Sequence, residues 1–229
     1  MTPEAIAAAF DAEAAALTAV AGGLTVTDLA RPSPCPPWTV AGLLCHVVLG
    51  AGRVATALAE PDPSRSGMIA TAAYYRPDER FSVTVNAERI DSAVRLAERL
   101  GTSAAISADL DSACQQTSAL LRATPLSRAI RTRHGDPMLL TDFARTRVVE
   151  LGLHGLDLAA ALDRPPWLTE RAADVIEALL LPGGLPAGLR ERLGVERSTL
   201  IAGLTGRADL PAAAKQALRE AGAVRLALG

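Results

Sequence analysis

The sequence contains few aromatic residues, because Phe, Trp and Tyr together make up 3% of its 229 positions. A core must therefore be built mainly from alanine, leucine and valine, and the hydrophobic content of 49% is too high for a disordered chain. Lysine is nearly missing, with Lys215 as its only representative, and the formal net charge is −2. This balance argues against a protein whose main partner is a nucleic acid or an anionic membrane surface.

Cysteine and long apolar runs are also scarce. Cys35, Cys45 and Cys114 form no CxxC pair and are odd in number, which predicts free thiols in a reducing compartment. The best apolar stretch, 39–52, is shorter than the run of about 18 residues that a membrane span needs, and it contains His46. The first residues include an acid and lack the basic start of a signal peptide. We therefore expect a cytoplasmic protein with no membrane partner.

Helix signals recur through the first two thirds of the chain. Four long helical regions are expected, over 3–22 after Thr2, over 39–60 with Thr39 as cap, over 86–123 with a break near Gly101, and over 141–162. Between them, 25–30 is a short segment, 31–37 is too rich in proline to be helical, and 61–85 is polar and irregular. Residues 127–140 predict a β-hairpin around a Gly-Asp-Pro turn.

These signals predict a mainly α-helical protein. The first part, residues 1–164, is expected to be a four-helix bundle with a possible short β-hairpin, because facing helices of a bundle can build a site in its core. Pro165-Pro166 marks the expected boundary, and 165–229 is expected to form a small, mostly helical cap. In that cap Thr169 begins a helix, the run 181–184 interrupts it, and two or three short helices follow.

The last helix of the expected bundle carries a polar stripe. Glu150 and His154 are four residues apart and so share one helix face, with Arg147 and Asp157 a turn away on either side. The helix is apolar on most of its circumference, so periodicity leaves open whether the stripe faces solvent or the core. If the stripe is buried, its acid and histidine need partners, and a metal ion is one suitable partner.

A second histidine supports this interpretation. His46 lies in an apolar run of the helix expected over 39–60, where an imidazole is either a hydrogen-bonded core group or a ligand. Together with Glu150 and His154 it makes a set of two histidines and one carboxylate. Such a set suits catalytic Zn²⁺ with a fourth position open, and it can also hold Fe²⁺, Ni²⁺ or Mn²⁺.

Two motifs resemble a known family. Residues 35–46 are similar to the pattern C-P-x-W-T-V-x-x-L-x-x-H, and residues 147–159 are similar to R-x-x-E-x-x-x-H-x-x-D-L-A. Both patterns are typical of the mycothiol-dependent maleylpyruvate isomerase family, which belongs to the DinB-like metal-binding bundles. The resemblance covers residues 1 to about 164, and the ligands of the family fall on His46, Glu150 and His154. It implies two cofactors, a divalent metal and the low-molecular-weight thiol mycothiol.

Further site residues follow from the resemblance and the loops. A T-G-R-A element, similar to one in shorter-tailed relatives, makes Arg207 a candidate catalytic residue that clamps a substrate carboxylate; the alternative is an exposed arginine. Asp157, the second candidate catalytic residue, either orients a metal ligand or pairs with Arg145 on the helix surface. Candidates for cofactor binding are Arg147 and the loop residues Tyr74, Tyr75 and Arg76.

The sequence therefore predicts an enzyme that joins a thiol to an electrophilic small molecule, as an S-transferase or a cis–trans isomerase. Two other interpretations stay open at this level. A metal hydrolase on the same bundle would work without any thiol. A binding or regulatory bundle would keep the fold without the chemistry. The composition allows a monomer or a homodimer.

Overall fold

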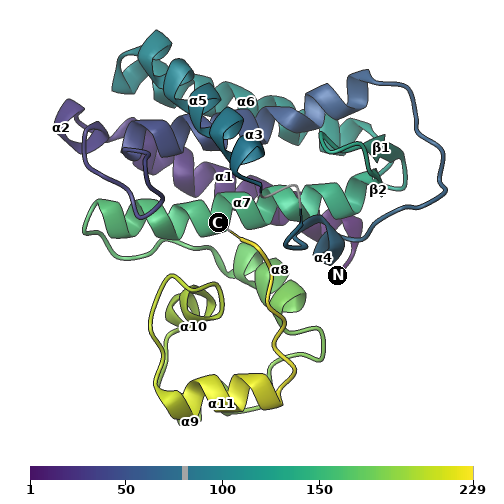
Figure 1. Cartoon of the computed structure of the whole chain (residues 1–229), viewed down its shortest axis with the longest axis vertical. Helices are drawn as coiled ribbons and strands as arrows, with labels where there is room; N and C mark the ends of the chain where they lie inside the picture. Colours follow the sequence, from purple (N-terminus) through teal and green to yellow (C-terminus); the bar gives the residue numbers. More distant parts are fainter. Residues whose placement is uncertain (79–81, 229) are drawn as a thin grey trace.

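Four helices form the bundle in the computed structural model of this chain, which describes residues 1–78 and 82–228. They are α1 (Pro3–Gly22), α3 (Val40–Ala59), α6 (Ser103–Ala123) and α7 (Leu140–Ala161). Each of α1 and α3 packs against both α6 and α7, so the four helices enclose one core (Figure 1). The predicted mainly helical bundle is therefore confirmed.

Threonine caps fix where the helices start. The hydroxyls of Thr2, Thr39 and Thr102 each accept a hydrogen bond from a backbone N–H three residues further on. These bonds satisfy donors that a helix start would otherwise leave without a partner. The predicted starts of α1 and α3 are thus correct.

The region expected as one long third helix is two helices with different roles. Gly101 has a φ of 67°, a left-handed conformation that glycine adopts without strain, and it ends α5 (Val83–Leu100) before α6 begins. Helix α6 belongs to the bundle, whereas α5 packs on the outside of α3. The predicted break is confirmed, and α5 starts three residues before the predicted position.

The connection between α3 and α5 is more ordered than expected. It contains the one-turn helix α4 (Thr71–Tyr74), and both Tyr74 and Tyr75 are buried. The expectation of a polar, irregular stretch over 61–85 holds for 61–70 and is wrong for 71–75, where the tyrosine pair is buried against α7; residues 79–81 lie outside the described part of the chain. The predicted hairpin is present, with β1 (Ala129–Arg131) antiparallel to β2 (Pro137–Leu139). A further short helix, α2 (Val26–Leu29), precedes the proline-rich segment.

The C-terminal part is helical, as predicted. It contains α8 (Glu170–Leu180), α9 (Leu189–Leu193), α10 (Arg197–Leu204) and α11 (Ala212–Glu220). Apolar residues of α8 join the bundle core, and leucines at 181, 189, 200, 210 and 218 form a second, smaller core. The last segment then returns to the bundle, where the Ala227 N–H donates to the carbonyl of Tyr75 (Figure 1). The division at 164/165 stays a prediction.

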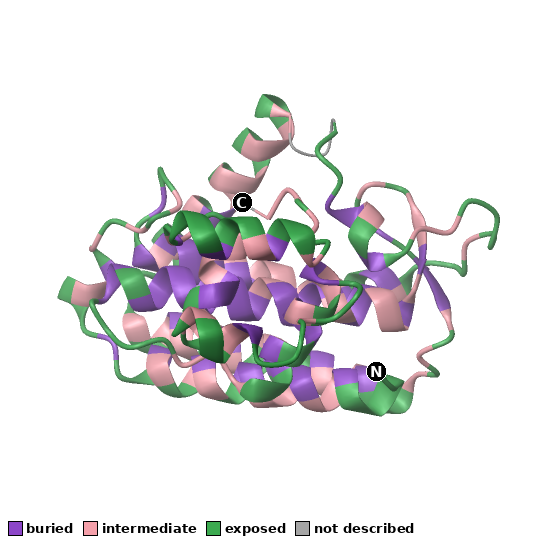
Figure 2. Cartoon of the chain, turned by 90° about the horizontal axis from the view of Figure 1, so that it is seen from below, coloured by how far each residue is buried: buried purple, intermediate pink, exposed green. Residues whose placement is uncertain are grey.

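Helix α7 is the most buried element. Of its 22 residues, 17 are buried, and they include Arg147, His154 and Asp157. Figure 2 shows buried residues gathered along the inner faces of the bundle helices. The polar stripe therefore faces the interior, which answers the question that periodicity left open. Helices α1 and α3 are also long and apolar enough to span a membrane by length and composition. Both pack in the bundle, and the core helix of a soluble protein passes the same test.

Candidate metal centre

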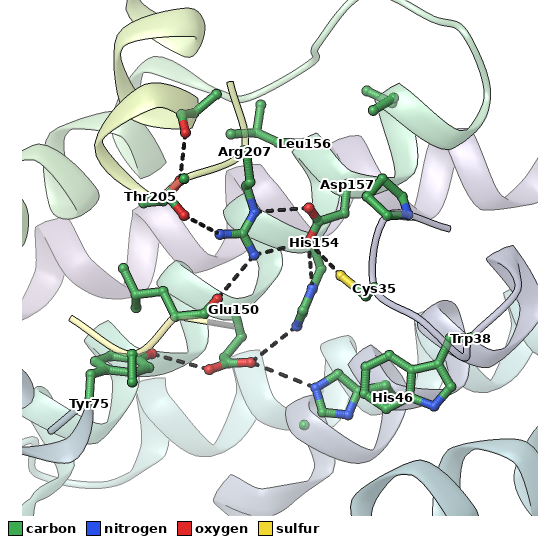
Figure 3. Close-up of a pocket in the computed structure, with 18 of the residues that line it drawn as sticks. Cys35, Trp38, His46, Tyr75, Glu150, His154, Leu156, Asp157, Thr205 and Arg207 are labelled. Atoms are coloured by element: carbon green, nitrogen blue, oxygen red, sulfur yellow. Dashed lines mark hydrogen bonds and ion pairs between the residues drawn. The ribbon is translucent and has the colours of Figure 1, made fainter. Parts of the chain in front are cut away.

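Two bundle helices bring three potential metal ligands together. His46 comes from α3, and Glu150 and His154 come from α7 (Figure 3). Glu150 Oε2 lies 3.8 Å from His46 Nε2 and 3.5 Å from His154 Nε2. One ligand atom from each residue lies within 4.8 Å of the other two. Two imidazole nitrogens and one carboxylate oxygen at this spacing are a donor set that fits a divalent ion.

A hydrogen bond fixes which nitrogen of His154 faces the site. His154 Nδ1 lies 3.0 Å from Asp157 Oδ2, so the Nδ1 proton is donated to that carboxylate and Nε2 points toward Glu150. Burial opposes a charge on His154, but hydrogen bonds to Asp157 and Glu150 outweigh it and raise its pKa well above the usual value. This environment attracts positive charge, as a metal site must.

The other two ligands are in the protonation states that metal binding requires. Burial lowers the pKa of His46 to about 4, which leaves the ring neutral at neutral pH. Burial alone would raise the pKa of Glu150, but hydrogen bonds from His154 and His46 and the charge of Arg147 hold it well below the usual value. A neutral imidazole and an ionised carboxylate both coordinate without first losing a proton.

Neighbouring aromatic residues hold these ligands in place. The Trp38 ring stacks on His46 with centroids 4.5 Å apart and an interplanar angle of 24°. A Cβ atom at Gly42 would lie 3.0 Å from Trp38, so the small residue leaves room for this ring. The hydroxyl of Tyr75 lies 3.3 Å from Glu150 Oε1 and 3.1 Å from the carbonyl of Thr146. Sequence reasoning proposed Tyr75 as a cofactor contact, and the structure places it in the cavity wall, in contact with Glu150.

Arg207 and Asp157 form a buried pair behind His154. Arg207 Nε and Nη2 donate to the two carboxylate oxygens at 2.9 and 3.0 Å, and Arg207 Nη2 also donates to the Leu228 carbonyl. These bonds and the bond from His154 lower the pKa of Asp157 to about 2 although burial opposes this. The alternative of an exposed Arg207 is wrong, because its side chain is 10% exposed. The alternative of a pair with Arg145 is also wrong, because Asp157 is buried and Arg145 bonds Asp142.

Sequence reasoning did not assign Cys35 to the site. Its thiol donates to Asp157 Oδ2 at 3.3 Å, and Cys35, His154 and Asp157 form a second group whose atoms could hold a metal. The guanidinium of Arg207 already faces both oxygens of Asp157, and this positive charge disfavours a cation there. Of the two groups, the one that contains His46 is therefore the better candidate for a metal site. The available signal was the position of Cys35 at the start of the 35–46 motif.

Arg147 is a buried cation beneath the ligands. Its guanidinium donates to the Gly50 carbonyl at 3.1 Å, approaches the Tyr74 hydroxyl at 3.5 Å and lies over the Phe143 ring at 4.8 Å. Arg147 and Tyr74 thus lie at the site as the sequence indicated. Arg76 is exposed, and it is not among the described residues that line the cavity.

The three ligands open into a cavity of about 670 Å³. The C-terminal segment contributes Ala227 and Leu228 to its wall, and residues from α3, α5, the hairpin turn and α10 contribute others. Three arginines that sequence reasoning missed also line it: Arg53, Arg89 and Arg133. They come from three separate elements, so no local motif could mark them. A cavity of this size suits a small-molecule ligand.

The fold is that of a DinB-like four-helix bundle with a helical C-terminal region, and its donor set could hold a metal ion. Residues 10–159 match the family model described as the mycothiol maleylpyruvate isomerase N-terminal domain. The match spans more than half of the chain, so this chain belongs to that family. The family predicted from the two sequence motifs is thus confirmed.

Solved structures give the same fold over nearly the whole chain. The crystal structure of the mycothiol-dependent maleylpyruvate isomerase superposes with a TM-score of 0.60 and 13% identity, covering 92% of each chain. A histidine-to-alanine mutant of that enzyme gives the same score and identity, with 91% of this chain and 90% of the other covered. The likeness therefore includes the C-terminal region. A comparison with curated proteins gives no match.

Proposed function

We propose that this chain is a zinc-dependent enzyme in which mycothiol attacks an electrophilic small molecule, as an S-transferase or as a cis–trans isomerase. The observation that carries the proposal is the set of two histidines and one glutamate, with atoms within 4.8 Å of one another, at the wall of a cavity. Membership of a mycothiol-linked family supports the choice of thiol, and the likeness to an isomerase fold supports the reaction class.

The donor set supports catalysis rather than a structural metal role. His46, Glu150 and His154 supply three ligands, and the described residues add no fourth to this group. A catalytic zinc site keeps such a position open, whereas structural zinc is held by four protein ligands. When bound, a zinc ion supplies a position at which a thiol, whose free pKa is near 8.5, is held as the nucleophilic thiolate.

The chain's own residues prepare this position. Asp157 accepts the Nδ1 proton of His154 and so leaves Nε2 as the nitrogen that would coordinate a metal ion, with release of its proton on binding. Arg207 holds Asp157 by two hydrogen bonds. Tyr75 bonds the oxygen of Glu150 that faces away from the histidines. The ring of Trp38 fixes the plane of His46. In these roles Asp157 and Arg207 are positioning residues.

The cavity allows the thiol and the electrophile to meet at the ligands. In the isomerase reaction the sulfur adds to an alkene carbon, and the resulting single bond allows rotation. The sulfur then leaves, and the double bond forms again in the other configuration. In the transferase reaction the same addition, or displacement of a leaving group, ends with release of the thioether. The volume of about 670 Å³ lies within the range of small-molecule sites, which supports either outcome.

We also propose that the enzyme works in the cytoplasm, where cysteines stay reduced, without nucleic acid or membrane partners, as a monomer or homodimer. Cys35, Cys45 and Cys114 are free thiols in the structure, which agrees with a reducing compartment. The proposed division is a bundle over 1–164 and a small helical region over 165–229.

Turnover with and without thiol tests the proposal. Zinc-loaded protein is mixed with maleylpyruvate or monochlorobimane, in the presence or absence of mycothiol, and loss of substrate is followed by absorbance or fluorescence. We expect turnover with mycothiol, reduced at least 100-fold in Glu150→Gln and unchanged in the control Glu60→Gln, an exposed acid outside the cavity. Equal activity without thiol would identify a hydrolase instead. Absence of turnover with every electrophile and thiol would favour a binding protein.

A further inference from the structure

The cavity carries an excess of positive charge. Among the described residues that line it, six are arginines and two are carboxylates. Arg207 is paired with Asp157, Arg147 lies beneath Glu150, and Arg164 lies 4.0 Å from a carboxylate on α2. The other three arginines are at 53, 89 and 133. The charge of Glu150 acts on Arg53 and Arg89, but one carboxylate does not balance this group of arginines.

The three arginines converge on one end of the cavity. Arg53 is on α3, seven residues after His46, and so lies two turns further along nearly the same helix face. Arg89 comes from α5 and Arg133 from the turn of the hairpin. All three also line a smaller cavity of about 240 Å³ that shares this wall, in which Glu88 is the acidic residue. This end therefore presents guanidinium groups from three elements.

The positive charges at this end act on one another. Arg53 has no hydrogen bond or ion pair with any described residue, and burial together with the charges of Arg133 and Arg147 lowers its pKa to about 10. Burial and the charge of Arg133 also lower the pKa of Arg89, which bonds Asn86 on its own helix. Arg133 donates to His134 at 3.0 Å. A bound anion would relieve this repulsion, and guanidinium groups bind carboxylates and phosphates by paired hydrogen bonds.

Arg207, the residue first considered as the substrate clamp, is less suited to this task. Its Nε and Nη2 both face Asp157, and Nη2 also donates to the Leu228 carbonyl. The two-pronged face that would bind a substrate carboxylate is therefore already used.

We propose that Arg53, Arg89 and Arg133 bind the anionic end of the substrate, a group with two negative charges such as a phosphate or a pair of carboxylates. The inference rests on the proposed function, because it assumes that the reacting carbon lies at the metal centre. Seven helical residues separate His46 from Arg53, about 10 Å along the axis. The smaller cavity is nevertheless lined by His46 together with all three arginines, so the substrate is an electrophile whose charged end binds next to the metal centre.

Oxyanion binding to the full-length, zinc-loaded protein tests this site. Inorganic phosphate, succinate and the neutral dimethyl succinate serve as probes in calorimetric titrations and in thermal unfolding. The variant Arg53→Gln is compared with wild type and with Arg95→Gln, an exposed arginine of α5 that pairs with Asp91 and lies outside both cavities. Zinc content is measured for every sample.

We expect phosphate or succinate to bind and to raise the melting temperature of wild type and Arg95→Gln, and dimethyl succinate to do neither. Arg53→Gln should weaken binding at least tenfold and melt at a higher temperature than wild type without anion, because it removes a repelled charge. Tighter binding of phosphate than of succinate would identify a phosphate ester as substrate. Tighter binding of succinate would identify a dicarboxylate. Anion binding that Arg53→Gln leaves unchanged would place the anion on the metal and overturn the inference. If protein that contains one zinc per chain binds no anion, the inference is also overturned. If the protein takes up no zinc, the proposed function is refuted instead.

Discussion

The buried pair of Arg207 and Asp157 leads to a sharp prediction. Their side chains are 10% and 3% exposed, so solvent screens the charges little. Arg207→Ala removes both hydrogen bonds to Asp157 and the one to the Leu228 carbonyl, and it leaves the Asp157 carboxylate buried with fewer donors. Breaking a buried ion pair on one side costs about 3–5 kcal/mol. For a chain of this length the melting temperature should fall by about 6–20 °C.

Urea unfolding in the presence of a chelator measures this loss in the free energy of unfolding. A double-mutant cycle with Asp157→Asn isolates the interaction energy between the two side chains, which we expect to be about 2 kcal/mol or more. Arg31→Ala is the matched control, because Arg31 forms an ion pair with Asp163 whose side chains are 36% and 81% exposed. Such an exposed pair contributes about 0–1 kcal/mol. Equal losses for Arg207→Ala and Arg31→Ala would refute the assignment of a buried pair.

Four other substitutions have defined outcomes. Burial raises the pKa of Glu13 above 4.5, so the folded chain loses stability as the pH rises through the raised value. The variant Glu13→Gln mimics the protonated acid. In urea titrations its stability should equal that of wild type near pH 4 and exceed it at pH 8. The Cβ atom added by Gly52→Ala lies in a helix and meets no atom within 4 Å, so this change should stabilise the folded protein by about 0.5–1 kcal/mol. The Cβ atom added by Gly203→Ala would lie 2.3 Å from a leucine, so that change should destabilise the protein by about 1–3 kcal/mol. Thermal unfolding measures both effects. Tyr75→Phe removes the hydrogen bond to Glu150 and should weaken zinc binding about 10–100-fold in chelator competition, with little change in fold by circular dichroism.

The sequence predicted those features that depend on local signals. Capping threonines and prolines gave the starts of α1 and α3, and the glycine at 101 gave the break between α5 and α6. Four-residue spacing placed Glu150 and His154 on one helix face. The apolar surroundings of His46 left its role open, and it was grouped with them because two histidines and one carboxylate make a metal-ligand set. The structure does bring these three residues together, with one potential ligand atom of each within 4.8 Å of the others.

Features that depend on distant pairing could not be predicted in this way. Arg207 is 50 positions from Asp157, and Tyr75 is 75 positions from Glu150, so nothing local to any of them reveals the partner. The helix α7 is apolar on most of its surface, and only packing against α1, α3 and α8 decides that its polar stripe is buried. Cys35 was visible in a motif, but its contact with Asp157 requires the proline-rich segment to lie against α7.

Metal binding by purified, untagged protein tests the central claim most directly. Zinc content is measured after equilibrium dialysis for wild type, His46→Ala, Glu150→Ala and His134→Ala, the last removing the remaining histidine of the chain. We predict one zinc per chain for wild type and His134→Ala, and loss of at least 100-fold in affinity for His46→Ala and Glu150→Ala. Zinc uptake that persists without His46 and Glu150, or no uptake by wild type, would contradict the account.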